Sequence, residues 1–398
     1  MKKLSSLCLF IFFISTLIAQ HPQKFDSLYK TIYAKDFCEL MQKNPEVVLL
    51  DVRSAGEFSD TSQYNSLNMG HLKGAVNLEI DAMKKNMSIL DQYRNKTMVI
   101  YCSHSQRSRR VSKLLAENGF TDFYNFNGGM SLLNQLNETA FPCKNSWIES
   151  GVGYKNISSL DAVKLIESQK DLIIVDVRPA IQYNSNDTLI ENNIGKIKGA
   201  INLPYAEIKQ KVGELDKYKN STILVYAGSG DGDGARTAAE LVSKGFTKVY
   251  NLLAGINELI ASQGKSVRLE TAIPFQLVDA HKALQLLQNA PGLVIIDARP
   301  LSEYENKDKL SYKNLGSIKN AIHVSNKDFE TYTLPANKAS SLLIYGNAAA
   351  YKFAWILGAK GYKNVYLMDG LYDFFWSSFN VEDCKDARNY LVNHEGIY

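Results

Sequence analysis

The stretch Tyr101-Cys-Ser-His-Ser-Gln-Arg-Ser108 holds the residues best suited to chemistry. An apolar run, Met98–Tyr101, precedes Cys102, and a helix-like run from Ser108 to Asn118 follows it. A cysteine between a buried strand and a helix N-terminus lies among backbone N–H groups, and these groups and the helix dipole favour anions. The thiolate is the reactive form of cysteine. The pattern therefore predicts a nucleophile at Cys102, and the alternative is a buried structural cysteine.

The residues that follow Cys102 are polar and make up the rest of the predicted site. Arg107 supplies a fixed positive charge for loop carbonyls or an anionic substrate. His104 is either a proton donor or an exposed loop residue, and the serine hydroxyls are potential donors to the sulfur. The candidate substrate-binding residues are Ser103, His104, Ser105, Gln106, Arg107 and Ser108. Arg109 and Arg110 are expected to be solvated, with steering of an anionic donor as the alternative.

The surroundings of this stretch occur three times in the chain. The segment Val47–Phe58 returns as Leu172–Tyr183 and as Leu293–Tyr304. A glycine follows each aspartate after nineteen residues, in the pairs Asp51 and Gly70, Asp176 and Gly195, and Asp297 and Gly316. A period of about 120 residues is the size of a domain, so the chain is a tandem of three domains. Apolar periodicity lapses near Phe141–Ile157 and near Gln263–Ile273, which are the expected linkers.

Each copy alternates apolar runs with helix-like stretches. A continuous apolar run such as Val47–Leu50 indicates a strand covered on both faces, as in a parallel sheet. Strands that alternate with helices predict an α/β domain with helices on both sides of the sheet. The predicted divisions are a signal peptide at 1–19, domains at 25–140, 155–264 and 273–380, and a C-terminal tail at 381–398.

The first copy contains an ordered set of motifs, DVRSAGEF, GHLKGAVNL, YCSHSQRS and ENGFTDFYNFNGGM. This set resembles the rhodanese-like domain family, and the resemblance extends over all three copies. It implies three tandem domains, each a parallel five-stranded sheet flanked by helices. It also implies that a sulfane sulfur from a small donor such as thiosulfate passes to a thiol or cyanide through a persulfide on Cys102, with no metal and no organic cofactor. The long segment between Phe58 and Gly70 departs from the family pattern and is expected to form an extended loop at the site entrance or on the surface.

The loop length distinguishes two activities within the resemblance. Related phosphatases carry Cys-x5-Arg, whereas Cys102 and Arg107 form Cys-x4-Arg, which goes with the smaller sulfur atom. The other two copies lack the nucleophile, because Ala227 and Gly346 stand in its place. Arg236 follows Ala227 by nine residues, and Lys352 is the nearest cation in the third loop. Both copies are therefore expected to be silent and to serve as scaffold, as substrate walls or as docking surfaces for a protein partner.

The recurring charged residues are predicted to be structural because they persist where the cysteine is absent. Asp51 and Arg53 have counterparts in both later copies and Glu57 has one in the third, and an Arg53–Glu57 pair is expected to support the strand end. His71 is expected to cap a turn.

The N-terminus predicts export. Lys2 and Lys3 precede an apolar run that ends near Ala19, which is typical of a signal peptide; the alternative is an uncleaved anchor. The expected location is periplasmic or secreted, with no stable membrane insertion after cleavage. A formal net charge of +4 gives no reason to propose nucleic-acid binding, and no cysteine–histidine cluster suggests a metal site.

The remaining cysteines leave alternatives open. Cys38 is expected to be a core residue. Cys143 is either a resolving thiol for the Cys102 persulfide, a free thiol, or a disulfide partner of Cys38 or Cys384. The preferred function is sulfur transfer. The alternatives are a non-catalytic binding or scaffold protein and a redox protein that uses Cys102 with another cysteine.

Overall fold

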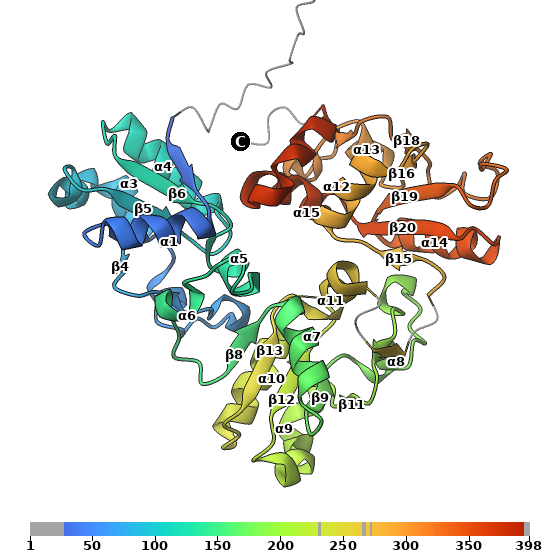
Figure 1. The fold of residues 1–398 in the computed structure, drawn as a ribbon, viewed down its shortest axis with the longest axis horizontal. Coiled ribbons are helices and arrows are strands. Elements are labelled where there is room, and N and C mark those ends of the chain that lie inside the picture. The colour runs from blue at the N-terminus through green and yellow to red at the C-terminus, as the bar shows by residue number, and fades with distance from the viewer. Residues whose placement is uncertain (1–27, 230–231, 265–267, 271–272, 394–398) are drawn as a thin grey trace, which may run out of the picture.

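The computed structural model describes residues 28–229, 232–264, 268–270 and 273–393. The predicted signal peptide, residues 1–19, lies outside the described residues. The described chain forms three α/β domains arranged around a triangle (Figure 1). Each domain has one five-stranded sheet in which all paired strands are parallel, so the predicted fold class is confirmed.

The first domain has the strand order β1-β6-β5-β2-β4. The strands of this sheet are β1 (Lys30–Ile32), β2 (Val48–Asp51), β4 (Val76–Asn77), β5 (Met98–Tyr101) and β6 (Phe123–Phe126). The helices are α1 (Ala34–Lys43), α2 (Ala55–Phe58), α3 (Ile80–Lys85), α4 (Gln106–Glu117), α5 (Gly129–Gln135) and α6 (Lys144–Trp147), with the 3-10 turns η1 (Asn65–Leu67) and η2 (Met87–Tyr93).

The second domain repeats this topology with the order β11-β9-β12-β13-β8. The strands are β8 (Lys155–Ile157), β9 (Ile173–Asp176), β11 (Ile201–Asn202), β12 (Ile223–Tyr226) and β13 (Val249–Leu252). The helices are α7 (Ser159–Ser168), α8 (Ala180–Tyr183), α9 (Ile208–Lys211), α10 (Asp233–Ser243) and α11 (Gly255–Gln263), with η3 (Ile190–Asn192), η4 (Tyr205–Glu207) and η5 (Val212–Tyr218).

The third domain has the order β15-β20-β19-β16-β18. The strands are β15 (Gln276–Leu277), β16 (Val294–Asp297), β18 (Ile322–His323), β19 (Ser341–Gly346) and β20 (Asn364–Asp369). The helices are α12 (Ala280–Asn289), α13 (Leu301–Tyr304), α14 (Ala348–Ala359) and α15 (Tyr372–Asn380), with η7 (Ser311–Lys313) and η8 (Glu382–Tyr390).

Both faces of the first sheet are buried, which explains the uninterrupted apolar runs. Leu49 and Val99 pack with α1 and α5 on one face. Leu50 and Ile100 pack with α3 and α4 on the other face. Successive residues of a strand point to opposite faces, so a strand covered on both sides needs an apolar residue at every position.

A buried polar motif fixes the end of the strand in each copy and accounts for the nineteen-residue spacing. Arg53 Nη2 donates to Asp51 Oδ2 at 2.7 Å and to the Gly70 carbonyl at 2.7 Å, and both charged side chains are fully buried. The Tyr101 hydroxyl accepts a hydrogen bond from the Leu72 N–H at 3.0 Å. The other two copies repeat the arginine bonds, from Arg178 to Asp176 and Gly195 and from Arg299 to Asp297 and Gly316.

The predicted structural role of Asp51 and Arg53 is therefore confirmed, but the predicted Arg53–Glu57 pair is wrong. Asp51 lies two residues before Arg53 at the strand end and accepts from both its backbone N–H and its guanidinium. Because Arg53 pairs with Asp51, the carboxylate of Glu57 is available to a different cation.

The segment after each sheet folds back onto its own domain. Short antiparallel pairs join β3 (His71–Leu72) to β7 (Ile148–Glu149), β10 (Lys196–Ile197) to β14 (Leu269–Glu270), and β17 (Ser317–Ile318) to β21 (Leu391–Val392). In the third domain this return includes η8, whose Cys384 and Ala387 are buried. Residues 381–393 of the predicted tail therefore pack on the third domain.

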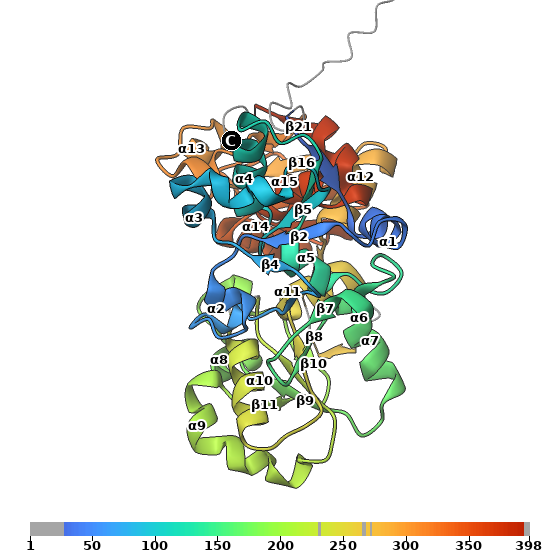
Figure 2. The ribbon, with the colours of Figure 1, turned by 90° about the vertical axis from the view of Figure 1, so that its left-hand side faces the viewer.

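Neighbouring domains contact one another in a ring. The turn η1 of the first domain lies on α10 of the second, and η3 of the second lies on α14 of the third. The extended loop predicted between Phe58 and Gly70 is thus a surface segment that contacts the next domain. Figure 2 shows the second domain below the other two. The first and third domains also meet, because Arg109 on α4 donates to Asn380 on α15.

A disulfide closes the first domain. Cys38 on α1 is bonded to Cys143, which precedes α6, across a sequence separation of 105 residues. This resolves the alternatives for Cys143 in favour of Cys38 and excludes Cys143 as a resolving thiol in this state. Cys38 is buried, as expected of a core residue, but its sulfur is part of a covalent link that the sequence left undecided.

Candidate active site

Cys102 lies at the carboxyl end of the first sheet, directly after β5 and before α4. Its exposure is 1 %, and it packs with Leu50, Ile100 and Val111. Its carbonyl accepts the Met130 N–H at 2.9 Å, which attaches the loop to the start of α5. Because Cys102 is so little exposed, either the molecule that reacts with it must be small or the loop must open before the reaction.

Within the described chain, the loop after Cys102 leaves the backbone N–H groups from His104 to Ser108 unpaired, and these groups are called the cradle below. Ser105 adopts a left-handed conformation with φ +66°, which turns the loop into the N-terminus of α4. Free N–H groups at a helix start attract an anion, and a thiolate or a persulfide is one.

Gly129 permits the close approach of α5 to this cradle. Its φ is +59°, and a Cβ atom at this position would lie 2.3 Å from the Cys102 carbonyl oxygen. Any larger residue would push the loop away from α5, so this glycine is required by the packing.

Arg107 is held by Glu57. Its Nη1 donates to Glu57 Oε2 at 2.5 Å and its Nη2 donates to Glu57 Oε1 at 2.7 Å. Glu57 also closes a capping box with Ser54 at the start of α2. Burial opposes ionisation of Glu57, but the hydrogen bonds from Arg107 and Ser54 outweigh burial and lower the pKa of this carboxyl.

The pair makes Arg107 a support of the loop. The hydrogen bonds to Glu57 raise the pKa of Arg107 above its usual range, and the nearby Cys102 thiolate adds a smaller effect in the same direction. Because Glu57 pairs with the guanidinium of Arg107, the unpaired backbone N–H groups are the donors that this loop leaves available to an anion.

Two of the three predicted serine hydroxyls serve the loop itself. Ser105 Oγ accepts the Gly128 N–H at 2.5 Å, and Ser108 Oγ donates to the Ser105 carbonyl at 3.1 Å. Ser103 Oγ accepts from Arg107 Nη2 at 2.8 Å, and in the described part of the chain its own hydroxyl proton is donated to no acceptor. Ser103 is therefore the serine free to donate to a sulfur anion.

The remaining two loop residues face outward. His104 is exposed, and its protein surroundings and then the Arg107 charge lower its pKa, which favours the neutral imidazole. Gln106 is also exposed, and its Nε2 donates to the hydroxyl of Tyr372 at 3.4 Å. Tyr372 belongs to α15 of the third domain, and no local sequence pattern indicates this contact.

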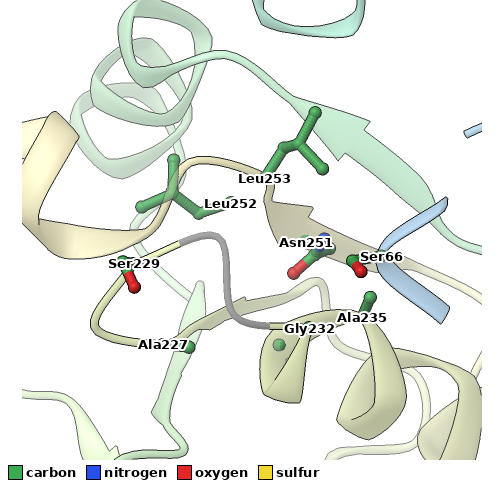
Figure 3. Close-up of a pocket in the computed structure, with 9 residues that line it drawn as sticks. Ser66, Ala227, Ser229, Gly232, Ala235, Asn251, Leu252 and Leu253 are labelled. Atoms are coloured by element: carbon green, nitrogen blue, oxygen red, sulfur yellow. The ribbon is translucent and has the colours of Figure 1, made fainter. Parts of the chain in front are cut away.

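The second copy has a longer sequence between its strand and helix, with Arg236 nine residues after Ala227. Ala227 occupies the cysteine position, and Ser66 from η1 of the first domain lies at the rim of the small pocket there (Figure 3). Arg236 donates to Asp233 at 2.8 Å within the first turn of α10, so it does not reproduce the Arg107–Glu57 pair.

The third copy retains a pocket at the corresponding place. The residues that line it are Arg299, Glu303, Tyr312, Lys313, Leu315, Asn347, Gly370, Leu371 and Tyr372. Lys313 Nζ lies 3.2 Å from Glu303 Oε1, so Lys313 on η7, and not Lys352 on α14, is the cation that pairs with the counterpart of Glu57. The thiol is absent because Gly346 ends β19.

The other cysteines in the described chain are bonded or buried. Cys38 and Cys143 are bonded to each other. Burial, and then the carboxylates of Asp279 and Asp383, raise the pKa of Cys384 to about 12. Among the described residues there is also no group of three or more metal-ligating side chains, and no helix is long and apolar enough to cross a bilayer.

A family model and several known proteins match parts of this chain. The model of the rhodanese-like domain matches residues 34–135, 159–262 and 279–376. Thiosulfate sulfurtransferase GlpE of Shewanella oneidensis is 30% identical over 94 residues, which are 24% of this chain and 90% of that protein. The uncharacterized protein YqhL of Bacillus subtilis is 30% identical over 129 residues, 32% of this chain and 90% of its own length.

Two further comparisons are more distant. The tRNA uridine(34) hydroxylase of Bacillus velezensis is 28% identical over 105 residues, and the chain spans only 30% of its length. A solved complex of an EanB variant with hercynine is matched over 91% of this chain and 98% of its own, with 15% identity and a TM-score of 0.26. The family-model matches cover more than half of the chain and set it among sulfur-transfer-related proteins. The chain is a member of the rhodanese-like domain family, present as three tandem copies.

Proposed function

We propose that the protein is a sulfurtransferase that carries a sulfane sulfur on Cys102. The observation that carries the proposal is the cradle of unpaired N–H groups around the one reactive cysteine of the described chain. Such a cradle stabilises both an attacking thiolate and an anionic persulfide.

The first half of the reaction loads the sulfur. The Cys102 thiolate attacks the outer sulfur of thiosulfate, a new sulfur–sulfur bond forms, and the original sulfur–sulfur bond breaks. Sulfite leaves with the bonding electron pair. The product is a Cys102 persulfide, whose terminal charge is held by the N–H groups of residues 104–108 and by the Ser103 hydroxyl. Arg107 and Glu57 keep this loop in shape.

The second half of the reaction transfers the sulfur from Cys102 to an acceptor. A thiolate acceptor or cyanide attacks the terminal sulfur, the Cys102 sulfur–sulfur bond breaks, and Cys102 returns as a thiolate. The products are an acceptor persulfide or thiocyanate. No electron is gained or lost overall, so neither half requires a redox cofactor.

The proposed location is outside the cytoplasm, periplasmic or secreted. The Cys38–Cys143 disulfide supports this, because such bonds form and persist in oxidising compartments and are rare in the cytosol. The signal-like N-terminus agrees with it.

The second candidate is a scaffold in which the domains bind a protein partner. It is favoured by the absence of a thiol at Ala227 and Gly346 in two of the three copies. A redox role is less well supported, since every other cysteine in the described chain is bonded or buried.

A steady-state assay of thiocyanate formation from thiosulfate and cyanide tests the enzyme proposal. Wild-type protein is expected to turn over, and Cys102→Ser is expected to be inactive while remaining folded. Cys384→Ser is the matched control and should retain the activity. Equal rates of turnover for wild type and Cys102→Ser would overturn the proposal, and no turnover by wild type would favour the scaffold.

A further inference from the structure

Helix α15 of the third domain contacts the first domain beside the Cys102 loop. Arg109 Nη2 on α4 donates to Asn380 Oδ1 at 2.6 Å, and its guanidinium lies over the rings of Trp376 and Phe379 at 5.4 and 5.8 Å. Asn127 Nδ2 donates to the Phe379 carbonyl at 2.6 Å. These contacts make Arg109 part of an interface, so the predicted solvated role is wrong for it. Arg110 is exposed, as predicted.

Arg109 and Asn127, the two residues that bond to α15, are both connected to the turn that shapes the loop. That turn is Ser105, whose φ is +66°. The Arg109 N–H donates to the Ser105 carbonyl at 3.0 Å, and Gly128, which follows Asn127, donates to Ser105 Oγ at 2.5 Å. Asn127 Oδ1 also accepts from Arg109 Nη2 at 3.4 Å, which joins the two sides.

A third contact connects the loop itself to the same helix. Gln106, the first residue of α4, donates to the Tyr372 hydroxyl at the start of α15. The helix α15 therefore touches the loop end, the first turn of α4 and the turn before α5. These are the elements that orient the N–H groups around Cys102.

The copies without a cysteine do not share these residues. Asn127 directly follows strand β6, and the equivalent residue is Leu253 after β13 in the second copy and Asp369 at the end of β20 in the third. Leu253 packs against the core of the first domain, so this position again meets a neighbouring domain but by apolar contact. The hydrogen bonds of Arg109 and Asn127 to α15 therefore belong to the copy that has the thiol.

We propose that Arg109 and Asn127 are positioning residues through which the cysteine-free third domain sets the reactivity of Cys102. The contacts hold Ser105 in its strained conformation and keep the N–H groups directed at the sulfur. Loss of the contacts between α15 and these two residues weakens anion stabilisation at Cys102 while both domains remain folded. The proposal rests on the proposed function only in taking Cys102 as the reacting thiol.

The test compares three variants of the full chain: Arg109→Ala, Asn380→Ala and the double variant. The first readout is the thiolate absorbance of Cys102 as a function of pH, taken as the difference from the matching Cys102→Ala protein. Because Arg109→Ala removes a hydrogen bond that helps to hold the loop, we expect the midpoint to rise by roughly 0.3–1 pH unit in this variant. The second readout is the rate of persulfide formation with thiosulfate at pH 7, which should fall roughly 2- to 10-fold.

Arg110→Ala is the control, because it removes the same charge from the next residue of α4 without touching α15. Its thiolate midpoint should equal that of wild type. Asn380→Ala lies wholly in the third domain and should shift the midpoint in the same direction as Arg109→Ala, and the double variant should add little to Arg109→Ala. Asn380→Ala also keeps the test decisive if Arg109→Ala unfolds.

Unchanged midpoints in folded Arg109→Ala and Asn380→Ala proteins would overturn the proposal, and so would an equal shift in Arg110→Ala. The titration needs no sulfur donor. A shifted thiolate midpoint without any sulfur transfer would therefore support the coupling between domains and refute the proposed function. Sulfur transfer with an unshifted midpoint would support the proposed function and refute the coupling.

Discussion

Removal of the Cys38–Cys143 disulfide is expected to destabilise the first domain and leave the chemistry intact. The bond closes a loop with a sequence separation of 105 residues. The chain-entropy relation for a loop of this length gives about 4.7 kcal/mol at 25 °C, and removal of native disulfides usually costs about 2–5 kcal/mol. A loss of this size lowers the melting temperature of a domain of about 100 residues by roughly 10 °C or more. Cys38 packs on the α1 and α5 face of the sheet, whereas Cys102 packs on the opposite face.

The assay is thermal unfolding of wild type and of Cys38→Ser/Cys143→Ser, followed by circular dichroism with and without a reductant. The reductant should lower the first transition of the wild type and leave that of the double variant unchanged. Persulfide formation per folded molecule should be the same in both proteins at a temperature below either transition. Equal melting temperatures, or a double variant that folds but cannot be loaded with sulfur, would refute the reasoning.

Three other substitutions test other parts of the account. Glu57→Gln leaves Arg107 with a neutral partner and is expected to lower the stability of the first domain by about 1–3 kcal/mol, measured by urea unfolding at pH 7; no loss would show that the pair is dispensable. Burial, and then the carboxylates of Asp279 and Asp373, raise the pKa of Glu258 from 4.5 to about 8. A raised acid pKa means that stability is lost as pH rises from about 4.5 through about 8. Glu258→Gln should therefore unfold at a higher urea concentration than wild type at pH 9 and at a similar one at pH 4. Identical curves at pH 9 would contradict this. Ala227→Cys in a Cys102→Ala background should gain no persulfide mass, because its longer loop lacks the Arg107–Glu57 support; a gain would show that the cysteine alone is sufficient.

The fold was predictable because the copies repeat one pattern three times. The runs that end at Asp51, Asp176 and Asp297 are apolar at nearly every position, and a strand needs this only when both faces are covered. The spacing from each aspartate to its glycine also has a physical cause, since the intervening arginine bonds both residues. The sequence showed the spacing but not the bond, and so assigned Arg53 to the wrong carboxylate.

The site was predictable only in part. The loop from Cys102 to Arg107 is local in sequence, so its position between a strand and a helix follows from the pattern around it. The partner of Arg107 is fifty residues away at Glu57, and the contacts of Gln106 and Arg109 are more than 260 residues away. Such pairs depend on how distant segments pack within a domain or between domains, and no periodicity in the sequence indicates this packing. The one available signal was that Arg109 and Asn127 are peculiar to the copy with the thiol.

The central claim is that Cys102 carries sulfur, and intact-mass analysis of the protein after exposure to thiosulfate tests it most directly. The account predicts that wild-type protein gains the mass of one sulfur atom, that cyanide removes the gain, and that Cys102→Ala never shows it. Failure of wild type to gain this mass from thiosulfate, mercaptopyruvate or polysulfide, or an equal gain in Cys102→Ala, would contradict it.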